Sequence, residues 1–326
     1  VRWMSFNRFI LEEQYQKVRG LGDRLVLMKE QIDWKPFIPL VQQVFHDDKK
    51  TGGRPHTDEI VVVRSMLLQA WYNLSDQELE YQCYDRLSFR NFLDYPETIP
   101  DFTTIWKIRD RLKEEGIDTL IWCEVQQQLD EKGFKVEKGT IQDAAFIEAD
   151  LGKKRYSKEK KARKNGEKIE YTKKQKQHMD RDASFSVKHG QVHYGYKSHI
   201  KVDTDHYLIR DYHVTTACVH DGEIDLSEQD EVVYRDRGYT GKETKAKGNG
   251  SMKRGNLSIK DKLRNKRIAR KRAPGERPFS VVKRTFHGER TQVKTRKRVE
   301  IKEMFKCFAY DLYQLVTLER KRLSVS

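Results

Sequence analysis

The spacing of apolar residues divides the chain near residue 134. Before this point apolar residues recur every three or four positions, which is the pattern of amphipathic helices. The clearest run is Ile60, Val63, Leu67, Leu68 and Trp71. We therefore predict an α-helical N-terminal domain over residues 1–134. Its expected helices cover residues 60–71, 101–115 and 117–131, after one or two short helices within 1–48.

Two local signals interrupt this helical pattern. Residues 51–55 contain two glycines and a proline, so they predict a loop. Ser75 and Glu78 have the spacing of a capping box, which marks the start of the next helix. Short helices joined by tight turns resemble a helix-turn-helix. A helix-turn-helix would allow this domain to bind DNA.

After about residue 136 the pattern becomes that of strands. Some segments are continuously apolar and others alternate between apolar and polar residues. The expected strands cover residues 140–147, 192–202, 208–215 and 231–236, and the last of them ends on a carboxylate. Further helices are expected from residue 278 and over 301–318. This mixture predicts an α/β domain over residues 135–326.

The distribution of charge favours an anionic partner. The net charge is +15, yet residues 1–150 carry a net charge of −7. The basic excess lies in residues 151–182, with a net charge of +8, and in 237–298, with +18. Such concentrated blocks are typical of surfaces that contact phosphates. Residues 151–182 have almost no large apolar residue and predict a mobile basic loop. Residues 237–272 are expected to form a basic segment of helix and loop.

The cysteines and the apolar runs exclude other classes of protein. The four cysteines, at positions 83, 123, 218 and 307, are widely separated, which disfavours a structural zinc site or a disulfide framework. Buried free thiols in a reducing compartment are the expectation. No apolar run approaches the roughly 18 residues that indicate a membrane span, and the N-terminus lacks the apolar core of a signal peptide. We expect a cytoplasmic protein without a membrane partner.

Three carboxylates stand at positions suited to metal chemistry. Asp143 lies within an apolar strand, where a carboxylate must be paired or bound to a metal. Asp236 ends a second strand, and Glu276 follows Pro274 and Gly275 at the start of a helix. Each acid alone is more simply explained as a cap or an ion-pair partner. As an ordered set beside two basic blocks, they favour a site for two metal ions of the Mg²⁺ type, which carboxylate oxygens bind well.

Several motifs resemble those of a known family. They are Gly53-Arg54-Pro55, Asp143 in the first strand, Tyr194-Gly195-Tyr196-Lys197-x-His199, His220-Asp221, Tyr234-x-Asp236-x-Gly238-Tyr239 and Glu276-x-Pro278-Phe279-x3-Lys283. The last two are fairly specific as an ordered pair. Together the motifs span most of the chain, which resembles the DDE transposases of the insertion-sequence four/five superfamily.

The resemblance implies an RNase-H-like catalytic domain over 135–326 behind the helical domain of residues 1–134, which would bind DNA ends, hold subunits together, or do both. It implies an endonuclease and strand transferase that cleaves transposon ends with water and joins the freed 3′-hydroxyl to target DNA. Asp143, Asp236 and Glu276 would be the catalytic, metal-binding residues. The cofactor would be Mg²⁺, with Mn²⁺ as a substitute. The partners would be double-stranded DNA and further copies of the chain, as a homodimer or a higher oligomer on DNA, in a prokaryotic cytoplasm and at the nucleoid when bound to DNA.

The family's third carboxylate belongs to a Tyr-x2-Arg-x3-Glu-x6-Lys signature. Arg272, Glu276 and Lys283 have these spacings, but Ala269 stands at the tyrosine position. Pro274 disfavours continuous helix, so Arg272 is expected to reach the site from a loop. If Glu276 is not the third carboxylate, Glu289 is the next candidate. The expected DNA contacts are Lys266, Arg267, Arg270, Arg272, Lys283 and Arg284.

The motif histidines favour support roles. His193 and His199 share a strand face, but six residues span about 20 Å, so the two rings cannot hold one ion. Tyr194 and Tyr196 are expected to be sheet residues. His220 is a candidate for a place beside the site, and a helix-capping role is as good an explanation for Asp221.

Two other functions stay open. One is a catalytically inactive or repurposed sequence-specific DNA-binding protein. The other is an RNase-H-like nuclease that hydrolyses DNA without strand transfer. A strand-transfer assay separates the latter from a transposase, because joined products require the 3′-hydroxyl to act as the nucleophile.

Overall fold

The computed structural model describes residues 6–45, 56–151, 153–177 and 179–325. The chain divides into two compact units. Unit 1 comprises residues 1–137, 206–209 and 304–326, and unit 2 comprises 138–205 and 210–303. The predicted loop at 51–55 lies outside the described residues. We describe each unit by itself.

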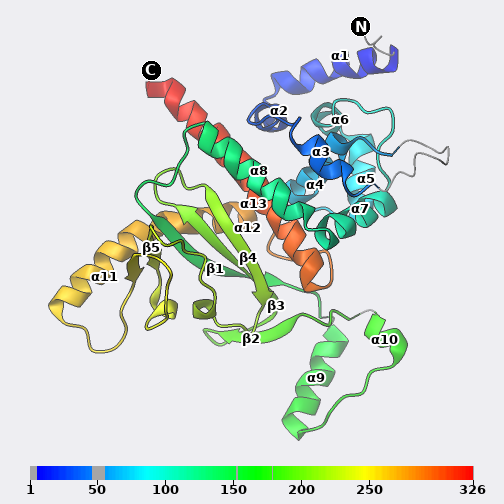
Figure 1. Cartoon of the computed structure of the whole chain (residues 1–326). Coiled ribbons are helices and arrows are strands. Elements are labelled where there is room, and N and C mark those ends of the chain that lie inside the picture. The colour runs from blue at the N-terminus through cyan, green and yellow to red at the C-terminus, as the bar shows by residue number, and fades with distance from the viewer. Residues whose placement is uncertain (1–5, 46–55, 152, 178, 326) are drawn as a thin grey trace. The chain divides into compact units, whose positions relative to one another are not determined.

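Unit 1 is helical, as the spacing of apolar residues predicts (Figure 1). The N-terminal part contains three helices where one or two short ones were expected, followed by five more in the described residues. Their bounds are α1 Phe6–Gly20, α2 Arg24–Lys29, α3 Phe37–Gln42, α4 Glu59–Tyr72, α5 Asp76–Asp85, α6 Leu87–Phe92, α7 Phe102–Glu114 and α8 Ile117–Glu131.

Local sequence signals set the ends of these helices. The Ser75 hydroxyl accepts a hydrogen bond from the Glu78 N–H, which confirms the predicted start of α5. Asp101 caps α7 in the same way through the Thr104 N–H. Helix α4 ends at Asn73, whose backbone is left-handed with φ 48°. Asparagine tolerates this conformation because its short polar side chain bonds locally.

The core of unit 1 includes the end of the chain. Helix α13 runs from Arg296 to Val325, so it begins in unit 2 and ends in unit 1. Phe308 on this helix stacks on Phe37 and on Trp34, with ring centroids 5.9 and 6.3 Å apart. The Asp311 carboxylate accepts a hydrogen bond of 2.8 Å from the Ile209 N–H. Residues 304–326 therefore complete the N-terminal core.

Unit 2 is a mixed sheet with helices, which agrees with the predicted RNase-H-like α/β domain. Its strands in the described residues are β1 Thr140–Glu148, β2 Ser184–Lys188, β3 Gln191–Asp203, β4 Ile209–Thr216, β5 Val232–Arg235 and β6 Gly248–Ser251. The order is β2-β3-β1-β5-β6, and β4 also pairs with β3. Strand β1 is therefore central. It runs antiparallel to β3 and parallel to β5.

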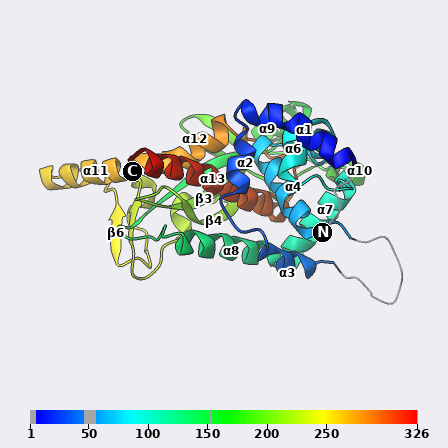
Figure 2. The ribbon, with the colours of Figure 1, turned by 90° about the horizontal axis from the view of Figure 1, so that it is seen from above.

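Helices α11 and α12 of unit 2 follow the second aspartate, Asp236. Helix α11, Ile259–Arg272, projects from the β5–β6 side of the sheet (Figures 1 and 2). A 3₁₀ turn, η3, covers Ala273–Gly275, and α12 follows over Glu276–Arg284. The other 3₁₀ turns are η1 Asp221–Glu223 and η2 Arg237–Tyr239.

The predicted mobile loop at 151–182 is wrong. This segment contains α9, Lys153–Asn165, and α10, Lys173–Gln177. Lys, Arg, Glu and Ala are good helix formers, and no Gly or Pro interrupts the run before Gly166. Low hydrophobicity shows that a segment buries little surface, but it does not prevent helical backbone.

The thiols are free, as expected, but not all of them are buried. Cys83 and Cys307 are buried, whereas Cys123 and Cys218 are exposed. Tyr194 and Tyr196 are buried residues of β3, as predicted. Their hydroxyls donate to the Asp180 backbone carbonyl and side chain, at 3.1 and 2.7 Å.

Candidate active site

The sheet brings Asp143 and Asp236 next to each other. In the parallel β1–β5 ladder, Thr140 is paired with Val233 and Ile141 with Tyr234. Asp143 lies two residues beyond Ile141, and Asp236 lies two residues beyond Tyr234. The same register therefore sets the two aspartates side by side where β5 ends, in agreement with the effect of the Asp236 carboxylate on the pKa of Asp143.

The surroundings of Asp143 disfavour a negative charge on its side chain. Its side chain is 23% exposed. Burial raises the pKa of Asp143, the Arg272 guanidinium and the Ala144 N–H lower it, and the neighbouring Asp236 carboxylate raises it again. Burial and a like charge both disfavour the ionised form. A positive group beside this pair of aspartates would stabilise their ionised form.

Arg272 supplies such a charge to Asp143. Its Nη2 lies 2.8 Å from Asp143 Oδ2, and the Arg272 side chain is 16% exposed. The prediction that Arg272 reaches the site from a loop is wrong, because it is the last residue of α11. Pro274 does break the helix, but only after Arg272, where the 3₁₀ turn begins.

A close backbone approach sets the position of Glu276. Gly275 is buried, and a Cβ atom built on it would lie 2.6 Å from Ile141 Cγ2. Only glycine lets the 3₁₀ turn approach β1 this closely. Glu276 is the first residue of α12, as predicted, and it is exposed. Its backbone therefore lies near the segment of β1 that carries Asp143.

The alternative third acid, Glu289, lies elsewhere along β1. The Glu148 N–H donates to the Glu289 carbonyl at 3.0 Å. Glu148 is five residues after Asp143, which corresponds to roughly 17 Å along a strand. The Glu289 carboxylate also pairs with Lys283 at 3.2 Å. This geometry favours Glu276 over Glu289.

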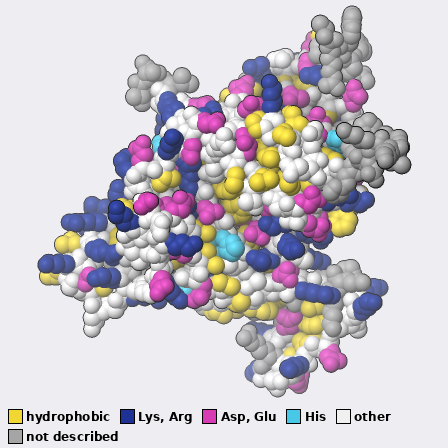
Figure 3. All heavy atoms as spheres, in the orientation of Figure 1, with side chains coloured by type: hydrophobic (Ala, Val, Ile, Leu, Met, Phe, Trp, Pro, Cys, Tyr) yellow, Lys and Arg dark blue, Asp and Glu magenta, His cyan; other side chains and the backbone are white. Residues whose placement is uncertain are grey.

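Apart from Arg272, which pairs with Asp143, the predicted DNA contacts fall into two groups. Lys266, Arg267 and Arg270 are exposed on α11, and Lys and Arg side chains gather over this helix in Figure 3. Lys283 and Arg284 are exposed near the end of α12. Lys283 lies seven residues after Glu276, which is two turns along one face of a helix.

Three further residues lie at the site, and the sequence alone assigns them no role there. The Lys197 ammonium group donates to the Asp221 carboxylate and to the Val219 carbonyl, at 2.8 and 2.7 Å. Tyr239 is buried, and burial together with the carboxylates of Asp143, Asp221 and Asp236 raises its pKa. Lys197 and Tyr239 belong to motifs already noted, and the available signals were a lysine within strand β3 and a tyrosine three residues after Asp236.

A helix-capping role was expected for Asp221, but the cap is formed by His220. The His220 ring accepts the Gly222 N–H at 3.1 Å and so caps η1, whereas Asp221 pairs with Lys197. His193 lies 2.6 Å from a Glu148 oxygen, while His199 contacts the Thr215 hydroxyl at 2.9 Å. The two histidines have separate partners, in agreement with the strand-spacing argument.

The three predicted carboxylates are not gathered around a common point. Across the described residues, no group of three or more His, Cys, Asp or Glu side chains has the arrangement of a ready-made metal site. The chemistry of the donors nevertheless fits a divalent cation. Two adjacent aspartates offer hard oxygen ligands, and their mutual repulsion would be relieved by the positive charge.

Two family models match the chain. A transposase domain (DUF772) matches residues 12–111, and a transposase DDE domain matches residues 175–312. The second match contains Asp236 and Glu276, whereas Asp143 precedes it. No solved structure matches the chain. In the described part of the chain, no helix is long and apolar enough to cross a bilayer.

The fold, the paired aspartates and the matched domains define the class of protein. The chain is a DNA transposase of the DDE type, with an RNase-H-like α/β unit and a helical N-terminal region. More narrowly, it belongs with the transposases of the insertion-sequence four/five kind. Membership in this class implies DNA as a partner and a divalent metal ion as a cofactor.

Proposed function

We propose that the protein cleaves transposon ends and joins them to target DNA, with Asp143, Asp236 and Glu276 as the metal-binding carboxylates. The observation that carries this proposal is the parallel register of β1 and β5, which makes Asp143 and Asp236 neighbours. Two partly buried acids side by side destabilise the fold unless a cation or hydrogen bonds compensate their charge.

Glu276 is the third carboxylate in this proposal. The Gly275–Ile141 contact holds the start of α12 against β1. An acid on the first turn of a helix can change rotamer without disturbing the core. Glu276 is exposed, so its side chain is able to turn toward the aspartates when a cation binds there.

The metal would be Mg²⁺, or Mn²⁺ in its place. When bound, it would activate the attacking oxygen and stabilise the leaving oxygen of the phosphodiester. The chain's own residues have other tasks. Arg272 balances the charge of Asp143, Lys197 orients Asp221 beside the site, and Lys283 holds a DNA phosphate near α12.

Protein–DNA contact would extend from the site onto α11. Lys266, Arg267 and Arg270 are exposed there, close in sequence to Arg272 at the aspartates. Exposed guanidinium and ammonium groups bind backbone phosphates without reading bases. Because transposition must bring two ends together, we propose that the working species on DNA is a homodimer or a higher oligomer.

The test replaces each carboxylate with its amide in the full-length protein. Asp143→Asn, Asp236→Asn and Glu276→Gln should each abolish cleavage of a duplex carrying the DNA ends that flank the gene. DNA affinity should stay similar or rise, because each change removes repulsion with phosphate. Asp85→Asn, an exposed acid on α5, is the matched control and should cleave normally.

The products then separate the candidate reactions. Joined DNA requires the 3′-hydroxyl to act as the nucleophile, so cleavage without joining would indicate a nuclease. A Glu276→Gln protein that cleaves at the normal rate would remove Glu276 from the site. Cleavage by all three variants would refute the proposed active site.

A further inference from the structure

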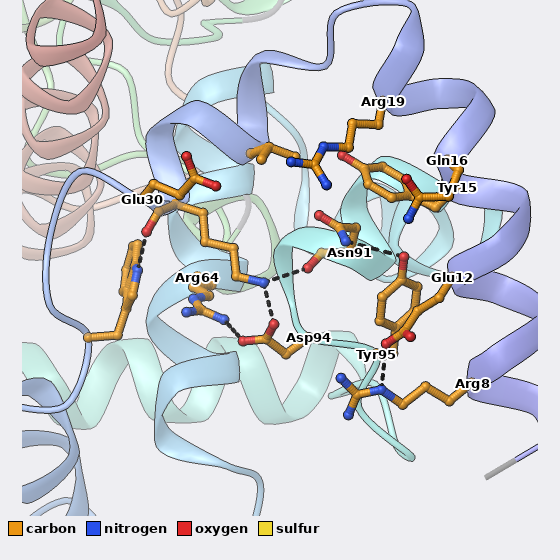
Figure 4. A pocket seen from close by; sticks show the side chains of 13 residues that line it. Arg8, Glu12, Tyr15, Gln16, Arg19, Glu30, Arg64, Asn91, Asp94 and Tyr95 are labelled. Carbon is orange, nitrogen blue, oxygen red and sulfur yellow. Dashed lines mark hydrogen bonds and ion pairs between the residues drawn. The ribbon is translucent and has the colours of Figure 1, made fainter. Parts of the chain in front are cut away.

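Unit 1 contains a cavity that combines positive charge with aromatic walls. Its volume is about 410 Å³, and four basic residues face three acidic ones around it. Figure 4 shows this cavity, whose lining includes Tyr15, Lys29, Trp34, Arg64, Asp94 and Tyr95. All of these residues lie before residue 96. They belong to the segment of residues 1–150, whose net charge is −7. The lining of the cavity thus carries a net charge of +1 within an acidic part of the chain.

Arg64 is the buried cation of this cavity. Its side chain is 5% exposed, and its guanidinium carbon lies 4.6 Å from the centroid of the Trp34 ring. It forms an ion pair with Asp94, but its Nε has no hydrogen-bond partner among the described residues. A buried guanidinium with an unused donor costs free energy. It also gives an incoming anion a ready donor.

Asp94 occupies the position that such an anion would take. Its carboxylate, 54% exposed, pairs with both Lys29 and Arg64. Asp94 and the next residue, Tyr95, both have positive φ, at 64° and 53°. Two successive left-handed residues other than glycine are uncommon. The backbone therefore holds a solvent-facing carboxylate against two cations.

The rest of the wall can hold a planar group. Figure 4 shows Tyr15 and Tyr95 on the side of the cavity formed by α1, and Trp34 also lines the cavity. The Asn91 amide donates to the Tyr95 hydroxyl at 3.2 Å. Arg19 also lines the cavity, and its guanidinium has no ion-pair or hydrogen-bond partner in the described part of the chain. Aromatic faces beside cations are the means by which proteins hold single nucleotides.

We propose that this cavity binds one nucleotide of DNA. Its phosphate would lie against Arg64, Lys29 and Arg19, in competition with the Asp94 carboxylate, and its base would lie against the tyrosines. Guanidinium groups suit phosphate because their donors match its oxygens. The site is separate from Asp143 and Asp236. The proposal depends on DNA binding and not on cleavage.

Equilibrium binding in EDTA tests the proposal without cleavage. The full-length protein is titrated into a short fluorescent DNA duplex at several salt concentrations. Arg19→Gln should flatten the slope of log affinity against log salt by about 0.9, the value for one phosphate that is no longer neutralised. Lys17→Gln, which is exposed on the same last turn of α1 but outside the cavity, is the matched control and should change neither affinity nor slope beyond its general charge effect.

Asp94→Asn provides a prediction of the opposite sign. Removal of the competing carboxylate should tighten DNA binding by up to about fivefold, a typical worth for one exposed ion pair. Asp85→Asn should have no such effect. If Asp94→Asn lowers thermal stability without tightening binding, the Arg64–Asp94 pair is only structural and the proposal fails.

Competition identifies the source of the phosphate. A deoxynucleoside monophosphate or inorganic phosphate should displace the duplex only weakly, because the DNA has further contacts elsewhere. If either compound binds tightly while Arg19→Gln leaves the DNA slope unchanged, the cavity binds a free small anion and the DNA assignment is overturned. Because EDTA suppresses cleavage, none of these results depends on the proposed active site.

Discussion

Gly275→Ala tests whether the seating of α12 on β1 sets the rate of cleavage. The added Cβ would lie 2.6 Å from Ile141 Cγ2. Carbon atoms normally approach to about 3.5–4.0 Å, so the two segments must separate by about 1 Å. The backbone angle of Gly275, φ −64°, suits alanine, so the effect comes from packing alone.

The size of the effect follows from this displacement. A misplacement of about 1 Å at a reacting centre can lower the rate about 100-fold. Overpacking should cost about 1–3 kcal/mol of stability, partly offset by the about 0.4–1 kcal/mol that alanine contributes through the unfolded chain. We therefore expect a folded protein that binds DNA normally and cleaves it about 100-fold more slowly.

Single-turnover cleavage at saturating protein is the appropriate assay, with DNA affinity measured in parallel. Adding Ile141→Ala should restore part of the rate, because it removes Cγ2. Adding Ile141→Val should not, because valine keeps both γ carbons. Gly20→Ala is the control, since a Cβ at Gly20 would meet nothing within 4 Å. A folded Gly275→Ala protein that cleaves at the normal rate would refute the reasoning.

The site and the charges support four further predictions. Lys283→Ala should lower the single-turnover rate more than DNA affinity, and equal reductions would indicate a general phosphate-binding role. Mg²⁺ or Mn²⁺ should support cleavage, whereas Ca²⁺ should allow binding with little chemistry because its coordination is looser, and full activity in EDTA would exclude metal catalysis. Replacing Lys158, Lys160, Lys161 and Lys164 of α9 with Gln should flatten the slope of log affinity against log salt by up to about 0.9 for each phosphate that these lysines neutralise. An unchanged slope would mean that α9 does not contact DNA. Burial lowers the pKa of His199 from 6.5 to about 4, so between these pH values the unfolded chain binds more protons than the folded chain. The stabilisation should be fully present above pH 6.5 and should fall by about 1.4 kcal/mol per pH unit toward pH 4. Thermal melting of His199→Gln should show a shallower decline over the same pH range.

Periodicity and capping residues predict most of the fold. Helices α4, α7 and α8 and strands β1, β3, β4 and β5 arise where apolar spacing indicates them, and α5 starts at its predicted cap. Strand β6 could not be predicted, because its sequence is Gly-Asn-Gly-Ser. A Cβ at Gly250 would lie 2.5 Å from the Val233 carbonyl oxygen. Close packing therefore determines this strand, against the intrinsic preferences of its residues.

The candidate site is only partly predictable for a similar reason. An acid in an apolar strand is visible in the sequence, and so is an acid at a strand end, which explains Asp143 and Asp236. Their pairing follows from a parallel register that no local pattern specifies. The Arg272–Asp143 contact joins residues 129 positions apart. Which residues form such long-range ion pairs depends on the tertiary structure.

Helix α13 has a consequence for biosynthesis. Unit 1 begins with the first residues of the chain but needs Met304–Ser326 to complete its core. A ribosome adds about 5–20 residues each second, so roughly 10–40 s pass between the synthesis of residue 137 and that of residue 326. During this interval Trp34 and Phe37 lack the partner on which they later stack. A nascent chain is therefore exposed to chaperones and proteases until helix α13 emerges, and truncation before residue 304 would leave the core of unit 1 incomplete.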